Sequence, residues 1–470
     1  MKPRGHRLQG GSATNPRAGR TGWCPLIRSG AKYARPAMTS RRRQGIAVVT
    51  AVSLVVLLVA GGAFALSRRG AHGSGPGTAF SSTTTTNPYA AREAAAVLAA
   101  EGAVNLPLAS VSGATVPRLA KRPYRHPLGS HEVVGFVPYY ELGSLAGTHL
   151  AAFTYLVYFA LQVRADATLV ESSTSGGWRS LQDGRASGLL TTARAGGDRV
   201  LLSVFADRQS VLQGLCSQPV TAARRLADSL APLLSRYGFA GVDLDLEGRN
   251  PSDRSGFTAF VTALSGRLRA IDPSWNLMLN VFPQSAEYPG GIFDLQALAP
   301  SVNELFVMAY DMNSTEVPSP SAPLFGSGLS DAAALATYSA EGLAAKVILG
   351  VPFYGYDFPA LGPLVGEPAY GQPYAVTYDD IVASITDNGH KPRWDPYSDT
   401  PFISFKRAGR WHQTWYDDPA SVALKVALAA QFHVAGVGAW ELGMVEGQPK
   451  MISVLAGGSP VVKLPLPHQP

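Results

Sequence analysis

Cysteine is almost absent from this 470-residue chain, which holds only Cys24 and Cys216. Two cysteines cannot form a disulfide framework or a thiolate metal cluster, and Cys216 is expected to be an inert buried side chain. The nine histidines show no ligand spacing. A Walker-type phosphate loop, a G-x-S-x-G elbow and an H-E-x-x-H motif are also missing from the sequence. We therefore expect neither a metal nor a cofactor.

Acidic side chains are missing from residues 1–69, which carry 13 Lys and Arg. The rest of the chain holds the other 27 basic side chains and all 33 acidic ones, a net charge of −6. The overall net charge of +7 is therefore an average over two unlike parts. A basic protein of this kind suggests a nucleic-acid partner, but the basic excess belongs to the N-terminal part alone.

Charged residues are also missing from Ile46–Leu66, a run of 21 residues that follows Arg41-Arg42-Arg43. A helix of this length spans roughly 30 Å, the thickness of a bilayer core. Basic residues ahead of it place the N-terminus in the cytoplasm and the body outside. We therefore predict a single-pass membrane anchor at 46–66 in contact with the lipid bilayer, no nucleic-acid partner, and an extracytoplasmic body.

The alternative to an anchor is a cleaved signal, because Ala63-Phe-Ala65 resembles a cleavage site; the protein would then be secreted. Residues 1–45 are predicted to be a basic disordered tail, with a start at Met38 as a second possibility. Residues 67–130 are predicted to be a flexible linker with one short helix, residues 131–457 the folded body, and 458–470 a C-terminal tail.

Short apolar runs alternate with amphipathic segments through the body. Near-continuous runs of this kind are typical of parallel strands covered on both faces. We predict eight strands, at Val133–Tyr139, Phe153–Ala160, Val200–Ala206, Ala240–Leu246, Leu277–Val281, Glu304–Tyr310, Val347–Pro352 and Val434–Trp440. With helices at Ala222–Tyr237, around Phe257–Leu268, at Ala333–Ala345 and from Asp418-Pro419 onward, this order indicates an α/β fold, a (β/α)8 TIM barrel, rather than a doubly wound sheet. A small α+β insertion is predicted at about 356–414, between the seventh and eighth strands.

Three acids alternate along the fourth run, Gly241-Val-Asp-Leu-Asp-Leu-Glu247. Because strand side chains alternate between faces, Asp243, Asp245 and Glu247 would all point into the barrel. Neighbouring buried carboxylates disfavour one another's ionisation, which favours a shared proton, with Glu247 as the candidate acid. A solvated edge strand and a divalent metal site are the alternatives for this pattern.

The same stretch, 240–247, resembles the D-G-x-D-x-D-x-E signature of family 18 glycoside hydrolases, the chitinase family. Further motifs of that family are matched in order, by Val134-Gly-Phe-Val-Pro-Tyr-Tyr140, Met308-Ala-Tyr-Asp311, Gly350-Val-Pro-Phe-Tyr-Gly355 and Gly436-Val-Gly-Ala-Trp-Glu441. The resemblance covers residues 133–443 and implies a TIM barrel whose partner is a glycan that contains N-acetylglucosamine.

The resemblance also implies roles for individual residues. Glu247 would be the general acid, Asp245 would orient the substrate's 2-acetamido group, and Asp243, touched by Ser203, would buffer the charge of Asp245. Tyr310 would act with these carboxylates at the cleaved sugar. The sugar would be bound by the residues Asp311, Met308 and Trp440. Tyr139 and Phe159 end the first two strands, where stacking on sugar rings and core packing are equally compatible with the sequence.

Two positions depart from the family pattern. Ala240 stands in place of the first Asp of the signature, and Ser203-Val-Phe-Ala206 replaces S-x-G-G, which adds bulk at Phe205. The predicted function is retaining hydrolysis of β-1,4 bonds in peptidoglycan or chitin by substrate-assisted catalysis. The alternative is a membrane-tethered barrel that binds glycans without cleaving them.

Overall fold

The computed structural model describes residues 131–143, 152–172, 176–288, 291–326 and 328–457. The predicted tail, anchor, linker and C-terminal tail, and with them Cys24, lie outside these ranges. Among the described helices, none is both long and apolar enough to cross a bilayer. The anchor at 46–66 and the domain bounds therefore stay predictions.

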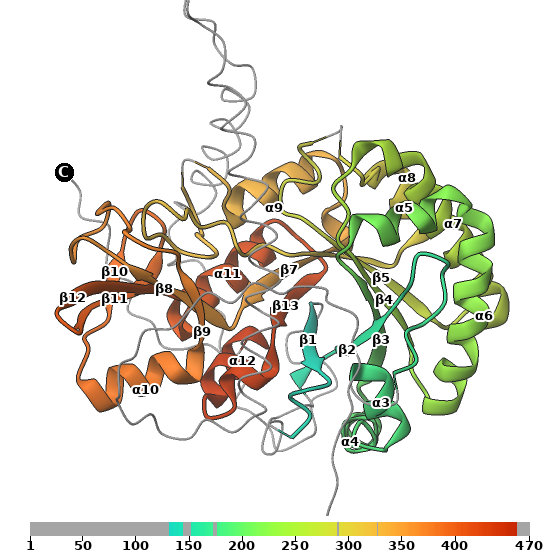
Figure 1. The fold of residues 1–470 in the computed structure, drawn as a ribbon, viewed down its shortest axis with the longest axis horizontal. Coiled ribbons are helices and arrows are strands. Elements are labelled where there is room, and N and C mark those ends of the chain that lie inside the picture. Colours follow the sequence, from blue (N-terminus) through green and yellow to red (C-terminus); the bar gives the residue numbers. More distant parts are fainter. Residues whose placement is uncertain (1–130, 144–151, 173–175, 289–290, 327, 458–470) are drawn as a thin grey trace, which may run out of the picture. The chain divides into compact units, whose positions relative to one another are not determined.

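Eight parallel strands close into a barrel, which confirms the fold class predicted from the apolar runs and excludes the doubly wound sheet. Around the barrel the order is β1, β13, β7, β6, β5, β4, β3, β2 and back to β1 (Figure 1). The strands are β1 (Glu132–Pro138), β2 (Tyr155–Gln162), β3 (Arg199–Ala206), β4 (Gly241–Leu246), β5 (Asn276–Val281), β6 (Glu304–Val307), β7 (Val347–Pro352) and β13 (Gly436–Trp440).

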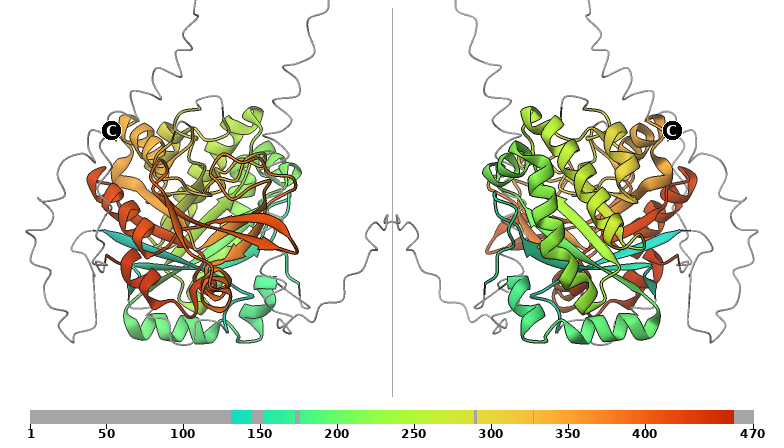
Figure 2. Two further views of the ribbon diagram at one scale, coloured as in Figure 1. Left: turned by 90° about the vertical axis from the view of Figure 1, so that its left-hand side faces the viewer. Right: turned by 90° about the vertical axis from the view of Figure 1, so that its right-hand side faces the viewer.

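Helices cover the outside of the barrel and bury the apolar face of each strand. They are α3 (Gly176–Gln182), α4 (Ser187–Gly196), α5 (Gln209–Ser217), α6 (Pro219–Tyr237), α7 (Arg254–Ile271), α8 (Leu295–Leu298), α9 (Asp331–Ala340), α11 (Pro419–Gln431) and α12 (Pro449–Leu455). The long helices α6 and α7 pack side by side over one wall (Figure 2, right). Asp418 caps α11 through a capping box with Ser421, as Asp418-Pro419 predicted.

Two predicted elements are shorter than expected. β6 ends at Val307, because the N–H groups of Ala309 and Tyr310 bond to carbonyls two residues back and turn the chain inward. The helix predicted at Ala333–Ala345 ends at Ala340, where Gly342 takes a left-handed conformation with φ of 74°.

The insertion between the seventh and eighth barrel strands is confirmed, with regular structure from Tyr354 to Trp415. It holds β8 (Tyr354–Pro359), β9 (Tyr374–Thr377), α10 (Tyr378–Asn388), β10 (Arg393–Asp395), β11 (Thr400–Arg407) and β12 (Arg410–Trp415). Its strands form an antiparallel sheet in the order β10, β11, β12, β8, β9, on the left in Figure 1. Since β8 starts two residues after β7 ends, this sheet begins directly at the carboxyl end of the barrel.

Candidate active site

β4 places its acids in the barrel interior, as its alternation predicts. Val242, Leu244 and Leu246 on the other face are fully buried beneath the helices. Of the acids, Asp243 is completely buried and Asp245 is 4% exposed, whereas Glu247 follows the strand and is half-buried. The three carboxyls therefore step from the closed interior towards the open carboxyl end, which is where TIM-barrel active sites lie.

Asp243 forms the floor of this site together with Ser203 of β3 and Asn280 of β5. Both carboxylate oxygens of Asp243 and the hydroxyl of Ser203 are buried without a hydrogen bond of regular geometry among the described residues. Burial raises the pKa of Asp243 to about 7, although the nearby polar groups of Ser203 and Asn280 favour its ionised form. Asp243 can therefore take up or give away a proton near neutral pH.

The pKa values of Asp245 and Glu247 are both raised. Burial is the main cause for each, and the next is the neighbouring carboxylate, that of Asp243 for Asp245 and that of Asp245 for Glu247. Because like charges this close cannot all be ionised in a buried site, the acids share protons. The charge of Arg249 lowers the pKa of Glu247 again only in part, so this pKa stays well above its ordinary value.

Above these acids lies a cleft at the carboxyl end of the barrel. Its walls come from seven segments that are far apart in the sequence. The lining residues are Phe159, Phe205, Asp245, Glu247, Asn280, Met308, Tyr310, Asp311, Tyr354 and Trp440. Seven of the ten residues that were named as candidate site residues on sequence grounds line this cleft, and Asp243 and Ser203 lie directly below it.

Trp440 forms the apolar side of the cleft. Its ring contacts Phe159 edge to face at 4.7 Å and Phe136 at 5.5 Å between centroids. These contacts hold the indole in one orientation, and only 9% of Trp440 is exposed. A fixed indole that lines a polar cleft suits the apolar face of a sugar ring.

Tyr310 and Asp311 follow the end of β6 and bring polar groups to the cleft. Burial and then the charges of Asp245 and Asp311 raise the pKa of Tyr310 well above its ordinary value, so its hydroxyl remains a donor. Asp311 has φ of 59°, and its Oδ1 accepts hydrogen bonds from Tyr354 at 2.5 Å and Tyr356 at 2.8 Å. Both tyrosines belong to β8, so the insertion holds one of the cleft's carboxylates in place.

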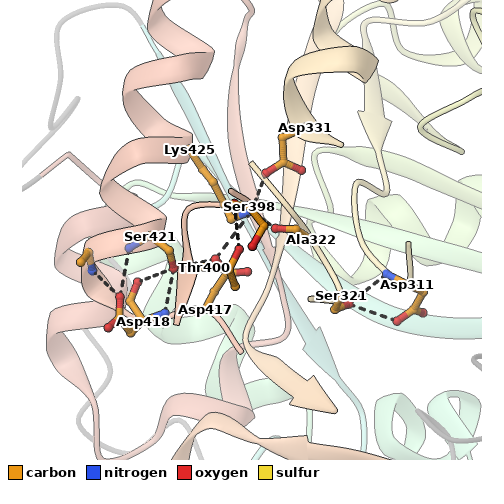
Figure 3. Close-up of polar contacts among 11 residues, drawn as sticks. Asp311, Ser321, Ala322, Asp331, Ser398, Thr400, Asp417, Asp418, Ser421 and Lys425 are labelled. Carbon is orange, nitrogen blue, oxygen red and sulfur yellow. Dashed lines mark hydrogen bonds and ion pairs between the residues drawn. The ribbon is translucent and has the colours of Figure 1, made fainter. Parts of the chain in front are cut away.

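A buried ion cluster lies behind Asp311 (Figure 3). The Lys425 ammonium of α11 donates to Asp331 Oδ2 and to the Ala322 carbonyl, each at 2.5 Å, and lies 3.6 Å from Asp417. Next to Ala322, the Ser321 hydroxyl accepts the backbone N–H of Asp311 at 2.9 Å. The cluster therefore fixes the segment after β6 that supports Asp311.

Tyr139 is the one candidate site residue that the structure does not bring to the cleft. It packs against Tyr140 at 5.2 Å and is not among the lining residues. Ser203 and Asp243 lie below the cleft rather than in its wall. Cys216 is buried, and burial raises its pKa to about 12, which agrees with an inert side chain.

Sequence reasoning missed three polar residues of the site. Asn280 could have been found as the polar residue inside the apolar run of β5. Tyr354 was part of a family motif, but neither it nor Tyr356 was given a role, because their contact with Asp311 depends on how the insertion folds back. Phe205, expected to add bulk, does line the cleft, opposite Asp245 in register and 5.3 Å from the Phe159 ring.

Comparison with known proteins agrees with this geometry. The chitinase of Cycas revoluta in complex with allosamidin shares the fold, with a TM-score of 0.62, at 22% identity over 69% of this chain and 98% of that one. The cortical fragment-lytic enzyme of Bacillus subtilis is 23% identical over 62% of this chain and 65% of its own length. Chitinase A1 of Niallia circulans is 28% identical over 47% of this chain and 37% of its own length.

The chain spans only part of the length of its relatives. Three further relatives match it over 51%, 31% and 30% of their own lengths. The family model, in contrast, spans the whole barrel: residues 135–444 match the glycosyl hydrolases of family 18. This range includes all eight barrel strands apart from the first residues of β1, together with every residue that lines the cleft. The chain therefore belongs to glycoside hydrolase family 18 and is a hydrolase of that family.

Proposed function

We propose that this hydrolase cleaves β-1,4 bonds next to N-acetylglucosamine with net retention at the anomeric carbon. The observation that carries the proposal is the meeting of Asp245, Glu247 and Tyr310 above Trp440 in one cleft. A neutral acid at Glu247 and a carboxylate two residues before it on the same strand are what substrate-assisted cleavage requires.

In the proposed reaction, Glu247 gives its proton to the glycosidic oxygen while the bond from that oxygen to the anomeric carbon breaks. The carbonyl oxygen of the substrate's own 2-acetamido group forms the new bond to the anomeric carbon. Asp245 accepts a hydrogen bond from the acetamido N–H, and the hydroxyl of Tyr310 donates a hydrogen bond to the acetamido group. Water then attacks the anomeric carbon while Glu247 takes its proton, and the bond from that carbon to the acetamido oxygen breaks. This restores the acetamido group and the acid.

The remaining residues hold the sugar and tune the acids. Trp440 supports the apolar face of the ring, with Phe159 and Met308 beside it, while Asp311 binds the sugar's hydroxyl side. Asp243 balances the charge of Asp245 when that group becomes ionised, and Ser203 supports Asp243. These roles are the ones that the family resemblance implies, and the places of the side chains in and below the cleft support them.

The proposed substrate is an envelope glycan, with peptidoglycan favoured over chitin because the predicted anchor would hold the barrel close to the cell wall. We place the protein in the cell membrane, with the barrel outside the cytoplasm. Relatives named as chitinases and one named as a cortical fragment-lytic enzyme support both substrate classes. Each of these classes contains N-acetylglucosamine.

The direct test is hydrolysis of a panel of chitin oligomers and purified cell-wall sacculi by the full chain, with the anomer of the first product read by NMR. We expect the β-anomer and new reducing ends from sacculi. Inverted product would overturn the substrate-assisted mechanism. Release of reducing ends from chitin oligomers but not from sacculi would overturn the choice of peptidoglycan.

Glu247→Gln tests the role of the acid. Removing a general acid typically costs about 10²–10⁴-fold in turnover, so kcat should fall by at least about a hundredfold while glycan binding is kept. Asp228→Asn on the outer surface of α6 is the matched control, since it makes the same change of carboxyl to amide far from the cleft. Equal turnover by the Glu247→Gln protein and the unaltered chain would contradict the assignment.

A further inference from the structure

Arg249 lies at the rim of the cleft, two residues after the proposed acid. It is half-buried, and its guanidinium carbon lies 4.5 Å above the centre of the Phe282 ring. Phe282 follows the last residue of β5, so this stacking places the guanidinium on the β5 side of Glu247. Arg249 therefore lies close enough to Glu247 for the two charges to affect each other, but it is not among the residues that line the cleft.

The segment that carries Arg249 is firmly packed. A Cβ on Gly248 would overlap the side chains of Leu212 and Ile292, so the backbone there lies tight against α5 and the segment before α8. Asn250 caps the turn that follows by accepting the Ser252 N–H at 3.1 Å. Arg249 is thus presented from a rigid base, which lowers the entropy lost when its side chain binds a ligand.

The charge of Arg249 is not balanced by an ion pair. No carboxylate of the described residues lies within salt-bridge distance of its guanidinium, although several other arginines form such pairs. Burial lowers the pKa of Arg249, and the charge that opposes this is that of Glu247, the group that must be neutral to act as an acid. A half-buried guanidinium stacked on an aromatic ring presents its fork of donors to an anion, and a carboxylate matches that fork.

The barrel geometry tells which part of a glycan Arg249 would meet. Trp440 at the end of β13 and Glu247 at the end of β4 face each other, because their strands lie four positions apart in the ring of eight. A sugar that rests on Trp440 with its leaving oxygen at Glu247 has its leaving sugar beyond Glu247, at the rim formed by β4 and its neighbours β3 and β5. Asp207, which follows β3, lies on the other side of β4 and would repel an anion there.

We propose that Arg249 is a specificity-determining residue that binds a carboxylate carried by the leaving-group sugar. This inference rests on the proposed function and narrows its substrate class to acidic glycans, in which the sugar after N-acetylglucosamine bears a carboxylate. Two sources share this chemistry: the free lactyl group of N-acetylmuramic acid, and the carboxylates of a peptide attached to it. Chitin, whose sugars are all neutral, supplies neither.

The test compares Arg249→Gln with the unaltered full chain on four substrates. These are a chitin tetramer, a peptide-free glycan with free lactyl carboxylates, its methyl ester and a peptide-bearing glycan. A hydrogen-bonded ion pair with a ligand corresponds to about 10–100-fold, so kcat/KM should fall by that factor on the free acid and change less than about threefold on the tetramer and ester. A fall in kcat/KM on the peptide-bearing glycan alone would show that Arg249 binds a carboxylate of the peptide.

A pH profile separates this role from an effect on the acid. If Arg249 acts only by lowering the pKa of Glu247, then Arg249→Gln would move the alkaline limb of kcat/KM equally for neutral and acidic substrates, and the proposal would be wrong. Unchanged kcat/KM on every substrate would also overturn it. Arg267→Gln, on the outer surface of α7, is the matched control.

Binding supplies a readout that does not depend on turnover. In the Glu247→Gln background, Arg249→Gln should weaken binding of the free-acid glycan by a similar factor and leave binding of the tetramer unchanged. If the full chain cleaves no glycan, the proposed function fails while this binding difference still decides the role of Arg249. Equal binding of both glycans in both proteins would overturn the inference.

Discussion

At the scale of single residues, the site depends on how far each acid of β4 lies from solvent. Asp243 is enclosed on all sides, Asp245 reaches the cleft wall and Glu247 stands at its edge. Their pKa values are raised chiefly by burial, so the protein environment rather than any unusual group makes a weak carboxylic acid hold a proton at neutral pH. Asp243, the most buried acid, can be tested without removing a group from the cleft.

Asp243→Asn should move the acidic limb of the kcat/KM profile to lower pH. Asp245 must be ionised to act, and it is ionised only above its raised pKa. Removing the Asp243 charge removes one cause of that rise, so the limb should shift down by about one pH unit. A pH titration of kcat/KM checks this, and an upward shift would contradict the proposed coupling.

At the scale of secondary-structure elements, Asp311 is held from two directions. β8 supplies two tyrosine hydroxyls to its carboxylate, and the segment after β6 supplies Ser321 to its backbone. An aspartate tolerates the left-handed conformation seen here better than most side chains do, but it still needs such support. Each support can be removed separately.

Tyr354→Phe should lower kcat/KM by about tenfold or more, because it removes a hydrogen bond to a charged group. Tyr374→Phe is the matched control: its hydroxyl donates to Asp357 within the insertion sheet at 2.6 Å, away from the cleft lining. Steady-state kinetics of both proteins check the expectation. Equal losses of kcat/KM in the two variants would show that the tyrosine hydroxyls act on stability rather than on Asp311.

Lys425→Met should destabilise the protein by about 3–5 kcal/mol, since it leaves Asp331 and Asp417 buried without their cation. Urea unfolding measures the loss in the free energy of unfolding. Arg267→Met breaks the exposed pair with Asp228 and should cost at most about 1 kcal/mol. Changing Asp331 and Asp417 to Asn as well should restore part of the stability of Lys425→Met, and no recovery would contradict the electrostatic explanation.

The sequence allowed the barrel strands, the insertion and most of the cleft to be predicted, because these depend on local patterns. Apolar runs mark buried strands, and alternation along β4 decides which way Asp243 and Asp245 point. The partners of Asp311 could not be predicted, since Tyr354 and Tyr356 reach it only because the insertion folds back over the barrel. The end of β6 was missed because residues 308–310 continue the apolar run, although the N–H groups of Ala309 and Tyr310 bond within their own segment rather than to a neighbouring strand.

At the scale of the whole molecule, charge is divided along the chain. Residues 1–69 carry 13 basic and no acidic side chains, while the remainder has a net charge of −6. For the proposed anchor at 46–66, the basic side belongs in the cytoplasm. The charge division along the chain is therefore the observation that supports the proposed location of the barrel outside the cytoplasm.

The full chain should sediment with membranes, and protease added to intact spheroplasts should digest the barrel. Deleting residues 1–66 should release the protein into the soluble fraction without loss of glycan hydrolysis. Immunoblotting of the fractions checks both expectations. A barrel that becomes sensitive to protease only after the membrane is broken would contradict the proposed orientation.

The two hydroxyls that β8 donates to Asp311 have a consequence for protein engineering. A segment inserted after a barrel strand is commonly regarded as a replaceable cassette that adjusts specificity. Here, exchanging residues 354–415 for the equivalent part of a relative would also exchange the support of a carboxylate in the cleft. A chimera that keeps Tyr354 and Tyr356 and takes the new sequence only after β8 is the combination that should preserve both the barrel's chemistry and the grafted surface.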